Sequence, residues 1–79
     1  MAEITFEIVD HLLVLSVSPR GWTKEVNIVS WNGRAPKIDI REWDEAHEKM
    51  GKGVTLSQDE LLKIKEWLDQ ADLESLDLG

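Results

Sequence analysis

Tryptophans and basic residues gather in one part of this chain. Residues 19–53 hold three of the four tryptophans and seven of the nine lysines and arginines. Indole rings offer flat surfaces on which nucleic-acid bases can stack, and cationic side chains can contact phosphates. Rings interleaved with cations therefore predict a surface that contacts single-stranded nucleic acid.

A hairpin is expected to position these side chains. An Asn-Gly pair at positions 32–33 separates two segments of alternating apolar and polar residues, which is a strong hairpin signal. With a loop over residues 32–34, Ile28 faces Ile38 and Val26 faces Ile40. A slip of one residue would put aliphatic side chains opposite charges, so we expect this register. One face is then aliphatic, and the other presents to solvent Trp31, Lys37, Arg41 and Trp43.

Other polar residues in this stretch predict binding rather than catalysis. Arg41 lies opposite Glu25 in the expected register, so the two can form an ion pair across the strands. Residues 44–53 show no strand alternation and end in Gly-Lys-Gly, which predicts a loop able to approach a phosphate backbone. His11 and His47 are isolated, and no nucleophile, base and orienting group occur as a set. We therefore expect no enzyme, no catalytic residue, no metal ligand and no cofactor.

Length and charge limit the class of protein further. Seventy-nine residues suffice for a single domain, 1–79, and the absence of cysteine excludes disulfides and a zinc knuckle. The net charge of −7 argues against a nucleic-acid partner, but the seven bases and six acids of residues 19–53 make that segment +1. Local charge decides phosphate contact. The longest apolar run, residues 12–15, is far too short for a signal core or a membrane span, so a cytoplasmic protein is expected.

The segment before the hairpin predicts a strand that needs cover. Residues 4–17 alternate as a strand does, and Asp10-His11 is a candidate bend or tight turn. From Leu12 to Val17 both faces are apolar apart from Ser16, so both faces must be covered. The C-terminal helix is expected to pack against one of these apolar faces, and a second subunit is expected to pack against the other.

The segment after the hairpin predicts a short last strand over residues 53–56 and then a helix. Ser57 followed by Glu60 is a capping-box signature. An apolar stripe follows on one side of the helix, and Trp67 within it is expected to belong to the core. The acidic tail, residues 72–79, either extends the helix or frays. Two roles stay open for it: it solubilises the protein, or it competes with nucleic acid for the basic surface.

These phrases together resemble a known family. Ile-Asp-Ile-Arg-Glu-Trp at 38–43 and Gly-Lys-Gly-Val-Thr-Leu-Ser at 51–57 are similar to the core of transcriptional positive cofactor four. Trp-Thr-Lys-Glu at 22–25, Ser-Trp-Asn at 30–32 and His-Glu-Lys-Met-Gly-Lys-Gly at 47–53 resemble its short bacterial relatives, the YdbC-like proteins. The resemblance covers about residues 4–70. It implies an α+β fold, with a four-stranded curved antiparallel sheet, one C-terminal helix and a two-fold dimer.

The resemblance also implies a function and a set of site residues. It implies binding of single-stranded DNA by a homodimer, with little sequence preference, in transcription, replication or repair. Arg41 and Trp43 match the family's arginine and its following aromatic, although positive cofactor four has an extra residue before that aromatic. The serine-rich acidic region of the eukaryotic coactivator has no counterpart here, so no coactivator role is expected. The full set of expected nucleic-acid-binding residues is Trp22, Lys24, Trp31, Arg34, Lys37, Arg41, Trp43, Lys49 and Lys52.

Two alternative functions use the same surface. Exposed tryptophans on a hairpin can dock a peptide or a partner strand, which would make the chain a protein-interaction module. The same platform can bind single-stranded RNA in loops or unwound ends. Competition between deoxy- and ribo-oligomers of equal length separates RNA from DNA.

Overall fold

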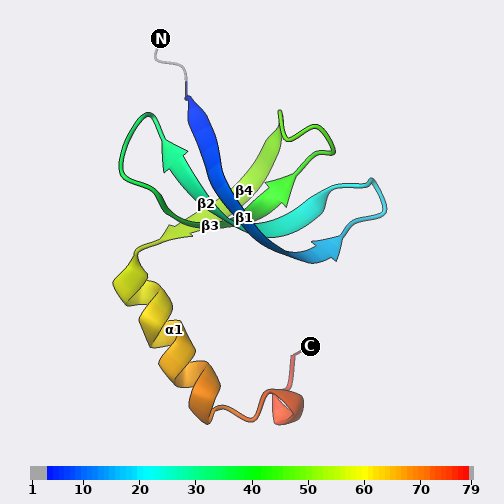
Figure 1. Cartoon of the computed structure of the whole chain (residues 1–79). Coiled ribbons are helices and arrows are strands. Elements are labelled where there is room, and N and C mark those ends of the chain that lie inside the picture. The colour runs from blue at the N-terminus through cyan, green and yellow to red at the C-terminus, as the bar shows by residue number, and fades with distance from the viewer. Residues whose placement is uncertain (1–3, 79) are drawn as a thin grey trace.

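The computed structural model describes residues 4–78 and contains one sheet, one α-helix and a short 3₁₀ turn (Figure 1). The predicted α+β fold, four curved antiparallel strands followed by one C-terminal helix, is confirmed. The elements are β1 (Phe6–Val17), β2 (Thr23–Trp31), β3 (Lys37–Trp43), β4 (Met50–Leu56), α1 (Gln58–Gln70) and η1 (Leu73–Ser75). The strands lie in the order β1-β2-β3-β4, so each pairs with its neighbour in sequence.

The central hairpin has the predicted register. Ile28 pairs with Ile38 and Val26 pairs with Ile40. Asn32 and Gly33 have φ angles of 51° and 72°, and the Arg34 amide donates to the Trp31 carbonyl at 2.9 Å. Positive φ at both central residues is the geometry of the type I′ turn, which Asn-Gly favours because it matches the twist of the flanking strands.

Strand β1 runs without interruption through Asp10 and His11, so the expected tight turn there is wrong. The alternative expectation, a bend, agrees with the register shifts on either side of this pair. The pairing of β1 with β2 shifts register three times, between Ile8 and Asp10, between His11 and Leu13, and between Val14 and Ser16. At each shift β1 advances by two residues while β2 advances by one. Such bulges bend a strand and increase its twist, which lets a long strand follow a curved sheet.

Strand β4 begins at Met50, so the expected Gly-Lys-Gly loop is wrong: residues 51–53 belong to the sheet. Gly53 pairs with Arg41, and a Cβ at this position would overlap the Arg41 Cβ and lie 2.5 Å from the Ile40 carbonyl oxygen. A glycine is therefore required there by the close approach of β3 rather than by contact with a ligand.

The sheet curls so strongly that its concave face makes its own core. Phe6 on β1 lies 5.0 Å from Trp43 on β3, measured between ring centroids, although these strands are not neighbours. The side chains that fill the concave face include the fully buried Val29 and Trp43. Three polar residues, Glu25, Asn27 and Asp39, are buried with them.

Helix α1 starts as predicted but does not cover the sheet. Ser57 accepts from the Glu60 amide and Glu60 accepts from the Ser57 amide, which completes the capping box. The helix then extends away from the strands (Figure 1), and no residue of α1 is buried. Trp67 is 53% exposed, so its expected place in the core is wrong for a single chain. The apolar stretch from Leu12 to Val17 is also exposed, because the helix does not reach it.

Within residues 4–78, no helix is long and apolar enough to span a bilayer.

Candidate nucleic-acid interface

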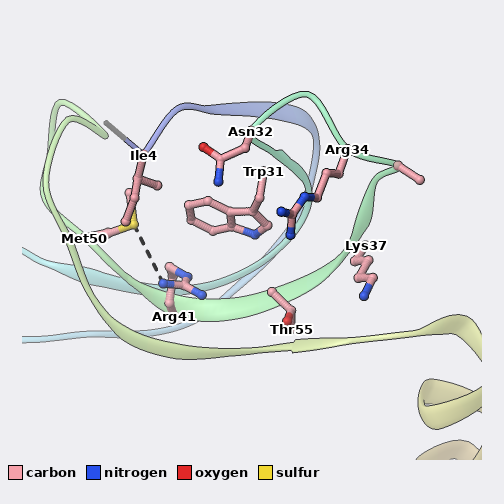
Figure 2. Close-up of a pocket in the computed structure, with 9 residues that line it drawn as sticks. Ile4, Trp31, Asn32, Arg34, Lys37, Arg41, Met50 and Thr55 are labelled. Carbon is pink, nitrogen blue, oxygen red and sulfur yellow. Dashed lines mark hydrogen bonds between the residues drawn. The ribbon is translucent and has the colours of Figure 1, made fainter. Parts of the chain in front are cut away.

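A pocket of about 400 Å³ opens beside the turn of the central hairpin (Figure 2). Four of the predicted site residues line it together, contributed by β2, β3 and the loop between them. The complete lining is Ile4, Trp31, Asn32, Arg34, Ala35, Lys37, Arg41, Met50 and Thr55. The curl of the sheet produces this grouping, because it brings the end of β2 over the middle of β3.

Trp31 is the central ring of the pocket. The Arg41 guanidinium carbon lies 4.6 Å from its ring centroid, in a cation–π contact. Phe6 packs against the same ring at 5.8 Å with a tilt of 50°. These contacts hold the indole in place while it stays partly exposed. Its N–H group is buried and has no hydrogen-bond partner among the described residues.

Arg41 is held by a buried carboxylate. Its Nε and Nη2 atoms donate to the two Asp39 oxygens at 2.6 and 2.8 Å, and Asp39 is fully buried. Glu25 is the cross-strand neighbour of Arg41, but the expected ion pair between them is wrong. Residues two apart on a strand share a face, so Asp39 was a visible alternative in the sequence. A paired Arg41 offers less net charge to a phosphate than a free one.

Glu25 is instead the centre of a second polar cluster. It accepts hydrogen bonds from Thr23 and Asn27, and its carboxylate lies 2.9 Å from Nε2 of His47 and 3.5 Å from Nδ1 of His11. Burial by itself raises the pKa of Glu25. The hydrogen bonds and the charge of His47 outweigh burial, so the pKa lies below its ordinary value of 4.5. The two histidines are therefore not isolated, as the sequence suggested, but meet at one carboxylate.

Trp43 does not face solvent, and that part of the sequence prediction is wrong. The residue is fully buried, between Phe6 at 5.0 Å and His47 at 5.8 Å, the latter ring nearly parallel to the indole. The curl of the sheet encloses this position, which a flat hairpin would expose. Trp43 thus supports the concave face from within, and its indole N–H also has no partner among the described residues.

The remaining predicted residues lie outside the pocket. Trp22 precedes β2, at the opposite end of that strand from Trp31, and Arg20 stacks on it at 4.9 Å. Lys24 is adjacent to the buried Glu25 and so points to the other face of the sheet. Lys49, in the loop before β4, and Lys52, on β4, are exposed.

The sequence analysis missed three polar or polarisable residues of the pocket: Asn32, Met50 and Thr55. Asn32 was visible only as a turn residue. Met50 lies before the expected start of the last strand at residue 53, and Thr55 lies within that strand, but no signal in the sequence placed either of them beside Trp31. Within residues 4–78, no group of three His, Cys, Asp or Glu side chains is arranged to hold a metal ion.

A single curled antiparallel sheet with one trailing helix, and a pocket that combines a tryptophan with cations, defines a small α+β domain of a known type. The chain belongs to the transcriptional coactivator p15 (PC4) family, whose model matches residues 18–67. A protein of Treponema pallidum (strain Nichols), described as uncharacterized, is 41% identical over 69 residues, which cover 87% of this chain and 81% of that protein.

Proposed function

We propose that this protein binds single-stranded DNA at the pocket around Trp31 and along the basic residues that flank it. The observation that carries the proposal is the partly exposed Trp31 ring, fixed by Phe6 and Arg41, in a pocket that Arg34 and Lys37 also line. Stacking and phosphate contact need this combination. Membership of a family known for single-stranded DNA binding supports it.

The side chains divide the work. Trp31 stacks a base, and the exposed Arg34 and Lys37 contact phosphates on either side of it. Arg41 acts mainly by orienting the ring, because Asp39 balances its charge. The DNA strand continues from the pocket toward Trp22, Lys49 and Lys52, and Trp43 stabilises the floor of the concave face. Lys24, on the other face of the sheet, lies off this path.

The active form in this proposal is a homodimer. Apolar side chains stay uncovered on β1 and on α1 in the single chain, among them Val17 at 66% and Trp67 at 53% exposure. So many exposed large apolar side chains are typical of a protein that associates through these elements. A second copy would cover both elements and place two sheets side by side for one DNA strand. We further propose that the protein serves transcription, replication or repair in the cytoplasm.

The test is a titration with a fluorescent thymidine oligomer, against duplex DNA of the same length. We expect tighter binding of the single strand, and a fall of log affinity with log salt of about 0.7 for each phosphate neutralised. An affinity that does not change with salt concentration, or a higher affinity for duplex DNA, would refute the proposal. A ribo-oligomer of equal length in the same assay decides between DNA and RNA.

A further inference from the structure

We propose that His11 and His47 form a second contact point for the DNA, a phosphate site that exists only when both imidazole rings are protonated. The inference rests on the proposed function and adds regulation by pH to it. The two rings are the only histidines of the chain. They line a second pocket of about 480 Å³, the histidine pocket, together with Ile8, Val14, Glu25 and Asn27.

The histidine pocket lies on the same concave face as Trp31. Positions 25, 27 and 31 are separated by even numbers of residues on β2, which pairs with β3 without a register shift, so Glu25, Asn27 and Trp31 share a face. Trp22 precedes the same strand, at the end nearer Glu25. A DNA strand that runs from Trp31 toward Trp22 therefore passes this pocket, where the two histidine side chains are 51% and 39% exposed.

Each histidine is bound through one ring nitrogen, which leaves the other nitrogen to take up a second proton. Nδ1 of His11 lies 2.6 Å from Oδ1 of Asn27, whose amide nitrogen donates to Glu25, so the neutral ring carries its proton on Nδ1. Nε2 of His47 lies 2.9 Å from the Glu25 carboxylate and carries its proton for the same reason. Within the described residues, Nε2 of His11 and Nδ1 of His47 form no hydrogen bond. Each of these nitrogens accepts in the neutral ring and donates once it is protonated.

Protonation also inverts the charge that the pocket presents to a phosphate. Glu25 is a carboxylate at neutral pH, because its pKa lies below 4.5. With both rings neutral, the cluster therefore carries one negative charge, which repels DNA. Two added protons turn that into one positive charge, beside two new donors for phosphate oxygens. Histidine ordinarily changes charge between about pH 5 and 8, so the switch falls in the physiological range.

The other charged groups around the cluster are carboxylates, lysines and one arginine. On β3, Asp39 and Arg41 form an ion pair with each other. On β1, Asp10 pairs with Ile28, which belongs to the opposite face of β2. The loop before β4, which carries His47, contributes Asp44, Glu45, Glu48 and Lys49. Groups of these types ordinarily titrate outside the range of histidine, so they do not produce the switch.

The test is the affinity for a thymidine oligomer at about pH 8 and about pH 5.5, since thymine takes up no proton between these values. We expect about tenfold tighter binding at the lower pH, as one hydrogen bond to a charged group would give. The slope of log affinity against log salt should also be steeper by about 0.7 at the lower pH, the share of one phosphate. A purely structural effect of protonation would leave this slope unchanged.

A double variant and a control assign the effect to the two rings. His11→Asn with His47→Gln places an uncharged amide nitrogen near each ring nitrogen that is now bound, so the donors to Asn27 and Glu25 are kept. This variant contains no histidine, and its affinity should be equal at both pH values. Gln70→His adds a titratable ring on an exposed residue at the end of α1, and it should keep the pH dependence of the wild type.

Several results would overturn the inference. Equal affinity of the wild type at both pH values, or an equal salt slope, refutes the phosphate site while leaving single-strand binding intact. So does a double variant that keeps the pH dependence of the wild type. If the double variant loses its far-UV spectrum, calorimetry of the wild type at about pH 6.5, in two buffers of different ionisation enthalpy, decides instead. Proton uptake on binding supports the site, and no uptake refutes it. Absence of binding to the oligomer at both pH values refutes the proposed function and the inference together.

Discussion

Two tryptophans that look equivalent in the sequence have different roles in the structure. Trp31 is partly exposed in the pocket, whereas Trp43 is fully buried. Trp31→Ala should weaken oligonucleotide binding by about 1–3 kcal/mol, the range for one stacked base, and the loss should persist at high salt. Trp43→Ala should instead lower the free energy of unfolding by about 3–5 kcal/mol. Titration and urea denaturation of both variants test this. Normal binding by folded Trp31→Ala would exclude the ring from the interface.

The pairing of Asp39 with Arg41 leads to a second prediction. Asp39→Asn keeps the size of the side chain but removes the charge that balances the guanidinium. Without that balancing charge, Arg41 can neutralise one further phosphate of the DNA. The slope of log affinity against log salt should therefore steepen by about 0.7. Titrations at several salt concentrations measure this slope. An unchanged slope would show that Arg41 does not contact a phosphate of the bound DNA.

Glu25 makes the fold sensitive to acid. Because its pKa lies below 4.5 in the folded chain, the unfolded chain takes up its proton first as the pH falls. The stabilisation is therefore complete above pH 4.5 and is lost as the pH falls through the folded pKa. Glu25→Gln should flatten this part of the stability profile in urea denaturation from neutral to acid pH. A profile as steep as that of wild type would assign the sensitivity to other carboxylates, such as Glu60, whose pKa is lowered by hydrogen bonds from Ser57.

At the scale of elements, the curl depends on the close approach of β3 and β4. Gly53→Ala places a methyl group against the Arg41 side chain and the Ile40 carbonyl, so the strands must separate. We expect a clear loss of stability, about 1–3 kcal/mol as for overpacked sites, together with weaker binding because Arg41 shifts. Gly51→Ala is the matched control, since its new methyl group meets nothing closer than 3.5 Å. Equal stability of the two variants in urea would contradict the role given to Gly53.

At the scale of the whole molecule, the uncovered apolar surface of α1 and β1 predicts a dimer. Light scattering at low micromolar concentration should give twice the 9.0 kDa chain mass. Trp67→Lys introduces a charge into the apolar stripe of α1 and should produce a monomer, because burying an unpaired ammonium group is unfavourable.

Glu66→Lys is the control for that prediction, because it lies beside Trp67 on the same helix but outside the stripe. It should stay dimeric. If the wild-type protein is a folded monomer in this assay, the proposed pairing of two sheets is refuted. Binding at the pocket of the single chain would still be possible.

Local signals in the sequence determined the hairpin and the start of the helix. The Asn32-Gly33 turn, the pairing of Ile28 with Ile38 and the Ser57–Glu60 capping box all depend on residues close in the chain, and each is found as predicted. The clustering of tryptophans and cations also pointed to the right part of the chain, because the pocket is built largely from one hairpin.

Only the tertiary structure decided which of those side chains meet and which are buried. Alternation along a strand tells which residues share a face, but it does not tell whether that face is flat or curled. The bulges of β1 and the close approach of β3 and β4 at Gly53 let the sheet curl over Trp43 and bring Arg41 against the Trp31 ring. These contacts join residues distant in sequence through the curvature of four strands, and no single segment of the chain specifies that curvature.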